Sequence, residues 1–207
     1  MQLKEILELA ALILSVVNAL ILIQNYLRDR PSLSIDPVHP DVYQWWFQLP
    51  DGEYNGNLTR RYGFLVYAGI GNRGLKKVAL KSWRLFIKTH AQRIKQELKP
   101  MTIPEPALKL GDYTKVFSVF GLTGLFSTGE TVIESGCSIS GWSYFLAEYY
   151  GAAEWNPIIK NNVIKGEFVV RDVFGGRAKA EITFTKKDFS FISEMLPGIE
   201  KIGEPPN

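Results

Sequence analysis

A glycine-rich pattern is the first candidate for a functional site in this chain. Residues 69–74 read Gly-Ile-Gly-Asn-Arg-Gly, the spacing with which dinucleotide-binding folds admit a pyrophosphate. That chemistry needs a following helix and an acidic residue about 20 positions on, but the first acidic residue after Gly74 is Glu97. We therefore interpret residues 69–74 as a tight turn between two antiparallel strands. A second pattern, residues 124–131, places Glu130 where a phosphate loop needs lysine, so we expect an ordinary loop.

Two further places offer metal ligands or a nucleophile. Asp36, His39 and Asp41 could hold a metal ion, but the set is minimal for a closed site and prolines interrupt it, so a solvated linker is favoured. Cys137 is the single cysteine, and as a nucleophile it would need one of the two histidines beside it. The sequence predicts no catalytic residues, no metal and no cofactor, and it favours a non-enzymatic protein.

An apolar run over residues 6–23 indicates where the protein works. About 20 helical residues, at 1.5 Å each, cross the hydrocarbon core of a bilayer. A cleaved signal peptide would need a basic start and a cleavage site, and a buried helix of a soluble domain is the other alternative. We predict a transmembrane anchor over residues 5–27 of a protein that spans the cell membrane once.

The charges that flank the run indicate an orientation. Arg28 and Arg30 follow it, whereas Lys4 stands beside Glu5 before it. Because positively charged flanks tend to stay in the cytoplasm, we predict that the C-terminal domain is cytoplasmic.

Small and polar residues line one face of the expected helix. Ala11, Ser15 and Asn18 follow four- and three-residue spacings, which place them along one stripe. Small residues let two helices approach closely, and asparagine can hydrogen-bond across the pair. The stripe is a candidate helix-pairing face for a homo-oligomer, although single Ser and Asn residues are also tolerated in lone anchors.

The rest of the chain has the pattern of a β domain. Aromatic residues make up 13% of the chain and it contains 18 glycines, which favours strands joined by turns. We divide it into a linker with a first strand (28–61), a β-sandwich core (62–190) and a C-terminal tail (191–207). The expected strands are 32–36, 62–70, 78–88, 115–120, 131–134, 143–149, 163–171 and 178–185.

Turns and short helices complete the predicted domain. We expect the second and third of these strands to form a hairpin, and the last two to form another, whose turn Asp172 starts. Short helices are expected at residues 91–98 and 187–196, and a frayed end from Pro197. Six to nine strands with few helices indicate a mainly β fold, an antiparallel β-sandwich preceded by one transmembrane helix.

Three segments carry a resemblance to a known group of proteins. They are Arg-Asp-Arg-Pro at 28–31, YAGIGNRGLKKVAL at 67–80 and GEFVVRDVFGGRAKAEI at 166–182. With them the chain resembles uncharacterised prokaryotic single-pass membrane proteins that have an N-terminal transmembrane helix and an immunoglobulin-like β-sandwich domain. The resemblance covers most of residues 5–186 and implies that the sandwich is immunoglobulin-like. It carries over no catalytic residue.

Nine basic side chains gather between residues 73 and 99, against one acidic side chain. On a tethered domain this basic stripe could lie on anionic lipid headgroups, at about 1 kcal/mol per well-placed cation. The alternative is a solvated hairpin face whose lysines block edge pairing. Nucleic-acid binding is less favoured, because stacking aromatics are sparse there. The candidate membrane-surface contacts are Arg73, Lys76, Lys77, Lys81, Arg84 and Lys88.

The adjacent Trp45 and Trp46 would point to opposite faces of a strand. We expect at most one of them to enter the core, and the other to lie at the membrane interface or in a partner's groove. A packed loop over one end of the sandwich is the default alternative.

These patterns favour a membrane-anchored, non-catalytic β-sandwich domain for protein binding or membrane-proximal assembly. Its expected partners are the lipid bilayer, anionic headgroups, and a protein partner or a second copy of the chain. One alternative is a membrane-tethered enzyme or small-ligand binder, with a pocket built by the loops of residues 37–61 and 121–157. The other is a nucleic-acid-binding module that uses the basic stripe.

Overall fold

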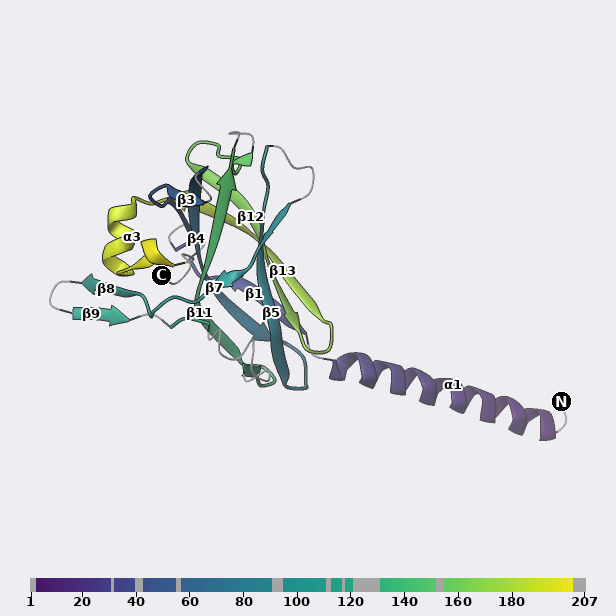
Figure 1. Ribbon diagram of the computed structural model, residues 1–207. Helices are drawn as coiled ribbons and strands as arrows, with labels where there is room; N and C mark the ends of the chain where they lie inside the picture. The colour runs from purple at the N-terminus through teal and green to yellow at the C-terminus, as the bar shows by residue number, and fades with distance from the viewer. Residues whose placement is uncertain are drawn as a thin grey trace.

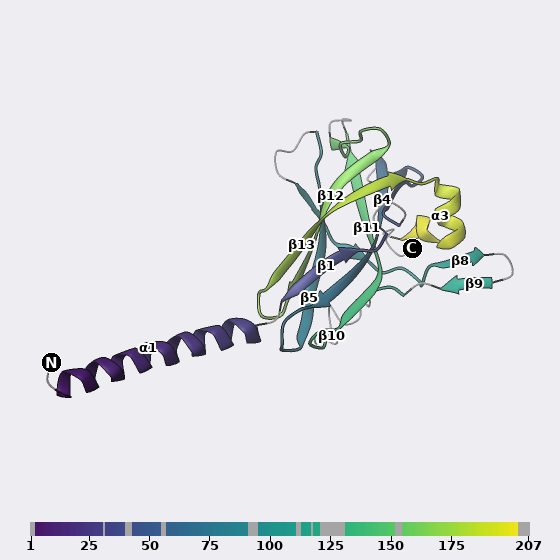
Figure 2. The same ribbon diagram turned by 180° about the vertical axis from the view of Figure 1, so that it is seen from behind.

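The chain forms a mainly β domain joined to one long N-terminal helix (Figure 1). The computed structural model describes residues 3–30, 32–39, 43–54, 57–90, 95–110, 113–116, 118–120, 131–151 and 155–202. Helix α1 (Leu3–Asp29) comes near the β domain at its C-terminal end, and the rest of the helix extends away from the domain in both views (Figures 1 and 2).

Helix α1 confirms the predicted helix and extends it at both ends. Its segment Leu7–Tyr26 has a mean hydropathy of 2.2, is long and apolar enough to cross a membrane, and has no buried residue. The helix ends at Asp29, two residues before Pro31, because proline disfavours helical geometry in the residue that precedes it.

In the described part of the chain, eleven strands form one hydrogen-bonded sheet that folds into two facing halves. In one half, β12 pairs with both β5 and β13; in the other, β4 pairs with β11 along its length. Strand β2 (Trp45–Gln48) joins the halves, since it pairs parallel to β13 and antiparallel to β4. The long strands are β4 (Asn57–Asn72), β5 (Val78–Ile87), β11 (Ser138–Tyr150), β12 (Val163–Asp172) and β13 (Arg177–Lys186).

Short strands line the sheet edges and raise the number of strands above the expected six to nine. They are β1 (Leu33–Pro37), β3 (Gly52–Tyr54), β6 (Gln96–Leu98), β7 (Pro100–Met101) and β10 (Val132–Ile133). Strand β6 corrects the helix expected at residues 91–98, because Gln96–Leu98 pair with the end of β5. Residues 91–94 lie outside the described part of the chain. The pairing with β5 overrides local helix propensity.

A further hairpin stands apart from the main sheet. Strands β8 (Ala107–Leu110) and β9 (Tyr113–Val116) pair only with each other among the described residues. The hairpin projects from the side of the domain in both views (Figures 1 and 2).

The first core lies between the two halves of the sheet. Even-numbered residues of β4 and of β13 face it, as the period of two requires. The ring centroids of Phe64 (β4) and Phe184 (β13) are 5.3 Å apart, and those of Phe145 (β11) and Phe168 (β12) are 6.1 Å apart. These contacts join the halves into a β-sandwich.

The second core lies on the outer face of β2, β4 and β11, under the C-terminal segment. Helix α3 (Phe189–Met195), which confirms the helix expected there, and the 3-10 helix η2 (Ile199–Lys201) cover it. Ile192 and Ile199 are fully buried. The expected fraying from Pro197 is therefore wrong as far as residue 202; residues 203–207 lie outside the described part.

This second core corrects the expectation for the tryptophan pair. Trp45 is 4% exposed and Trp46 is 3% exposed, so both are buried. They point to opposite faces of β2, but both faces are covered: Trp46 enters the core between the halves, and Trp45 the core under α3. Gly63 lies opposite Phe47, whose ring occupies the space a side chain would need.

One predicted hairpin is confirmed and one is wrong. Strands β12 and β13 pair antiparallel around residues 173–176, as expected. Strands β4 and β5 do not pair with each other, because β12, β13 and β2 lie between them in the sheet order. Residues 73–77 therefore carry the chain from one half of the sandwich to the other.

Candidate functional site

The crossing between β4 and β5 is built around Asn72, which is 2% exposed. Its side-chain oxygen accepts hydrogen bonds from the backbone N–H groups of Gly74 (3.0 Å) and Ser32 (3.5 Å). Its amide nitrogen donates to the carbonyl oxygens of Lys76 (2.8 Å) and Ile133 (3.1 Å). One side chain thus ties the strand that leaves α1 to the crossing loop and to β10. This satisfies polar groups that would otherwise be costly to bury.

The turn between β12 and β13 lies beside this crossing. As predicted, Asp172 starts it: Oδ1 accepts from the N–H groups of Phe174 (2.8 Å) and Gly176 (2.7 Å). Gly175 has φ of 89°, a left-handed geometry that suits glycine. The backbone N–H of Val173 donates to Ala79 of β5 at 3.1 Å. The turn holds Phe174 outward, with 74% of its surface exposed.

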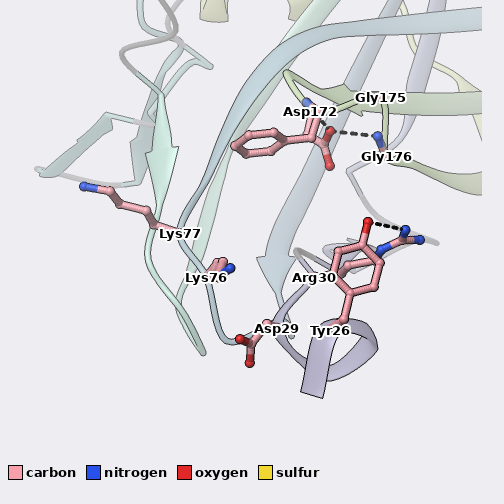
Figure 3. A pocket seen from close by; sticks show the side chains of 9 residues that line it. Tyr26, Asp29, Arg30, Lys76, Lys77, Asp172, Gly175 and Gly176 are labelled. Carbon is pink, nitrogen blue, oxygen red and sulfur yellow. Dashed lines mark hydrogen bonds between the residues drawn. The ribbon is translucent and has the colours of Figure 1, made fainter. Parts of the chain in front are cut away.

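A groove of about 950 Å³ lies between this turn, the crossing loop and the end of α1 (Figure 3). Arg30 donates a hydrogen bond to the hydroxyl of Tyr26 at 2.7 Å and lies 4.4 Å from the centre of its ring. Lys76 and Lys77 line the other side. These cations favour the binding of anions, and the described lining residues include no nucleophile beside a general base. The lining residues are Tyr26, Asp29, Arg30, Lys76, Lys77, Asp172, Phe174, Gly175 and Gly176.

The six candidate membrane contacts do not gather on one face. Arg73, Lys76 and Lys77 are exposed on the crossing loop near α1. Lys81 is the extra residue where the pairing of β5 with β12 shifts register. Arg84 is paired with Glu97, Nε to Oε1 at 2.9 Å. Lys88 follows the far end of β5, about 30 Å from the crossing at roughly 3.3 Å per residue.

A charge network centred on Glu167 pairs one further residue of the basic stripe, Lys95. Lys95 hydrogen-bonds Glu167 at 3.0 Å, and Arg177 and Lys179 lie 3.7 and 3.9 Å from its carboxylate. The Lys95 hydrogen bond, together with the charges of Lys95, Lys179 and Arg177, lowers the pKa of Glu167 below its ordinary 4.5, against the opposing effect of burial. The middle of the stripe is therefore an ion-paired sheet face.

The lowered pKa predicts how stability depends on pH. The folded chain binds a proton at Glu167 less readily than the unfolded chain, so the contribution is present above the ordinary pKa of 4.5 and is lost as pH falls through the folded value. We expect the melting temperature of wild type to drop more, between about pH 5 and about pH 3, than that of Glu167→Gln. Thermal unfolding followed by circular dichroism measures this. Glu194→Gln, an exposed site on α3 outside the Glu167 network, is the control and should keep the wild-type slope; equal slopes for all three proteins would contradict the expectation.

The candidate helix-pairing residues are exposed on α1. Ala11, Ser15 and Asn18 all face outward, and the Ser15 hydroxyl donates to the Ala11 carbonyl at 2.9 Å. The hydroxyl is therefore used within the helix, which leaves Asn18 as the polar group available for a neighbouring helix.

The residues considered for metal binding and nucleophilic chemistry do not assemble into such a site in the described part of the chain. No group of three His, Cys, Asp or Glu residues there is placed to hold a metal ion. Asp36 lies in β1, paired with β4, rather than in a linker; Asp41 is outside the described residues, as are residues 121–130 with their glycine-rich stretch. Cys137 is exposed, on the turn that precedes β11.

The loop-built pocket considered for a small ligand has only a shallow counterpart. A hollow of about 260 Å³ lies between the start of β4 and the end of β11, lined by Asn57, Leu58, Arg60 and Gly151. Among the described lining residues Arg60 is the one titratable side chain, and it already donates to the Gly151 carbonyl at 2.7 Å.

Sequence reasoning missed the apolar residues at the tips of the two turns. Leu75 is 52% exposed on the crossing loop, and Val173 and Phe174 are 45% and 74% exposed on the neighbouring turn. The sequence feature that could have identified them is the presence of apolar side chains inside glycine-flanked turns, where a polar residue is usual.

No protein-family model matches the chain, and no curated protein matches its sequence. Several solved structures resemble it weakly, and three of them are each 10% identical to it. The Northeast Structural Genomics Consortium target SoR45 has a TM-score of 0.30, with 84% of this chain and 92% of that chain covered. The archaellum periplasmic stator complex FlaF and FlaG from Sulfolobus acidocaldarius has a TM-score of 0.28, with 66% of this chain and 87% of that chain covered. The stator protein FlaG from the same organism has a TM-score of 0.26, with 67% of this chain and 99% of that chain covered. Likeness of this extent assigns neither fold nor function.

Proposed function

We propose that the chain is a single-pass membrane protein whose anchor, residues 5–27, holds a non-catalytic β-sandwich for protein binding and membrane-proximal assembly. The observation that carries this is the uncovered helix: Leu7–Tyr26 has a mean hydropathy of 2.2, and none of it is buried by the described part of the fold. Large apolar surfaces left in water are unfavourable, so a bilayer is the environment that suits this helix.

The β8–β9 hairpin supports the protein-binding half of the proposal. A two-stranded hairpin alone is marginally stable in water, and Val116 on β9 is 55% exposed. A partner strand that adds to the hairpin's free backbone groups would stabilise it, as in other strand-addition complexes.

Affinity capture of the tagged full-length protein from its membrane tests both halves. Wild type should float with vesicles and should retain a partner that is lost when residues 107–116 are replaced by a short Gly-Ser linker. A matched replacement of the β12–β13 turn tip, Val173→Ser with Phe174→Ser, should keep that partner. A full chain that stays in the soluble fraction would contradict the anchor, and retention of every partner by the linker variant would contradict the hairpin.

The domain's side of the membrane is the next element of the proposal. We propose a cytoplasmic domain, because Arg28 and Arg30 follow the apolar run and positively charged flanks tend to stay in the cytoplasm. Cys137 is exposed and reports the side directly. A membrane-impermeant maleimide should label it only after the cells are broken; labelling in intact cells would place the domain outside.

We also propose that anchors pair through the face of Ala11, Ser15 and Asn18, and that the sandwich is immunoglobulin-like. The exposure of the three residues supports the pairing of anchors. The crossing of the chain between the two halves at residues 73–77 supports the immunoglobulin-like fold. Asn18→Leu should insert normally but lose cross-linked dimer, so unchanged cross-linking would remove the pairing. An experimental structure with another strand order would remove the fold assignment.

A further inference from the structure

The end of the β domain nearest α1 is held close to the point where the helix ends. Helix α1 ends at Asp29 and strand β1 begins at Leu33. The three residues between them can span about 10 Å at roughly 3.3–3.6 Å each. Ser32 is hydrogen-bonded directly to the crossing loop, since the Arg73 N–H donates to its carbonyl at 2.7 Å. If α1 spans a bilayer, this end of the domain must therefore lie at the bilayer surface.

Two turns at this end expose apolar side chains beside cations. Leu75, Val173 and Phe174 are 52%, 45% and 74% exposed. The two turns adjoin, because Val173 bonds to Ala79 and Asp172 pairs with Leu80, just after the crossing loop. Phe174 lines the same groove as Lys76 and Lys77. The result is a small apolar surface bordered by positive charge.

We propose that this end of the domain is a lipid-binding surface, an inference that rests on the proposed membrane anchor. Leu75, Val173 and Phe174 enter the interfacial region of the bilayer that the anchor spans. Arg73, Lys76 and Lys77 contact anionic phospholipid headgroups. The short tether decides in favour of lipid over a protein partner, because it leaves about 10 Å between the helix end and the domain. Charge decides the lipid class, since juxtamembrane cations attract anionic leaflets.

The proposal also changes which basic residues face the membrane. The first three of the six sequence candidates lie on the crossing loop at this end, and Lys81 follows at the bulge of β5. Arg84 is neutralised by Glu97, and Lys88 follows the opposite end of β5. The domain therefore contacts the bilayer through the turns at this end, and the face of β5 does not lie along the membrane surface.

Single-cysteine labelling of the full chain in vesicles tests the proposal. In a Cys137→Ser background, Phe174→Cys and Leu58→Cys each carry an environment-sensitive fluorophore. Leu58 is the matched control: it is an exposed leucine (67%) near the far end of β4, 14 residues from Asn72 and about 45 Å away along the strand. In vesicles of phosphatidylcholine with phosphatidylglycerol, we expect a blue shift and strong quenching by brominated lipids at position 174, and neither at position 58.

Two further measurements separate the ways in which this can fail. Changing Lys76 and Lys77 to alanine should lower the equilibrium constant for contact between this end of the domain and the bilayer about fivefold per lysine in anionic vesicles. The same changes should have no effect in pure phosphatidylcholine. Flotation of the same samples reports anchoring separately. A chain that does not float contradicts the proposed function, whereas a chain that floats with equal, unquenched emission at positions 174 and 58 overturns only the lipid-binding surface.

Discussion

Replacing Trp45 with alanine is expected to destabilise the protein by about 3–5 kcal/mol, as much as replacing Trp46. Both indoles are buried, at 4% and 3% exposure, although they are adjacent on one strand. Trp45 lies 5.2 Å from the ring of Trp142 and 5.5 Å from Phe191, between β11 and the C-terminal helix. Trp46 donates its indole N–H to the Asn162 carbonyl at 2.9 Å and lies 6.3 Å from the ring of Tyr62. Each alanine leaves a cavity in a different core.

Denaturant unfolding of the full chain in detergent, followed by tryptophan fluorescence and circular dichroism, measures this expectation. Trp155→Ala is the control: Trp155 is 41% exposed, so its loss should change the free energy of unfolding by less than about 0.5 kcal/mol. A Trp45→Ala protein as stable as the Trp155→Ala protein would show that the second core does not form.

Replacing Arg61 with methionine is expected to release the C-terminal segment and to cost about 3 kcal/mol. The Arg61 side chain is 4% exposed and its Nε lies 3.2 Å from a carboxylate oxygen of Glu148. Its guanidinium also donates to the carbonyl oxygens of Glu200 and Ile202, both at 3.0 Å. Methionine fills the space but leaves the two carbonyls without this donor. Since Glu148 is 36% exposed and can be hydrated, we expect the lower end of the range for a broken buried pair.

Hydrogen exchange resolved by peptide measures where the Arg61→Met protein opens. Protection should fall in residues 189–202 before it falls in β12 and β13, because the even-numbered residues of β4 face the first core and Arg61 points to the opposite face. Arg60→Met, one residue away and bonded to Gly151 at the surface, should leave that protection unchanged. Loss of protection in every strand at once would indicate that the C-terminal segment is not a separately anchored cover.

Local patterns predicted most of the elements. Alternating residues identified β12 and β13 together with their turn, since Asp172 and the glycines after Phe174 determine the turn within five residues. The expected strands at 62–70 and 143–149 lie inside the longer β4 and β11. Alternation marks only where one face is buried. Beyond that region the two ends of β4 pair with the short strands β3 and β1, and the added residues of β11 pair with β4.

The failures arise where contacts join residues distant in the sequence. The crossing at residues 73–77 has the glycine and asparagine content of a hairpin turn, and only the sheet order shows that β4 and β5 belong to different halves. The strand at Gln96–Leu98 exists because β5 offers it an edge. Neither partner can be inferred from the segment's own composition.

The sequence by itself determined the long apolar helix, the mainly β class and the turn at Asp172, because hydrophobic periodicity and turn chemistry act over a few neighbouring residues. Only the tertiary structure decided that Trp45 and Trp46 are both buried, that Arg61 holds residues 200 and 202, and that the basic stripe divides into an exposed loop, an ion-paired centre and a distant end. The physical reason is that burial and ion pairing depend on what covers each face. Here the C-terminal segment and Glu167, both far along the chain, provide that cover and that charge.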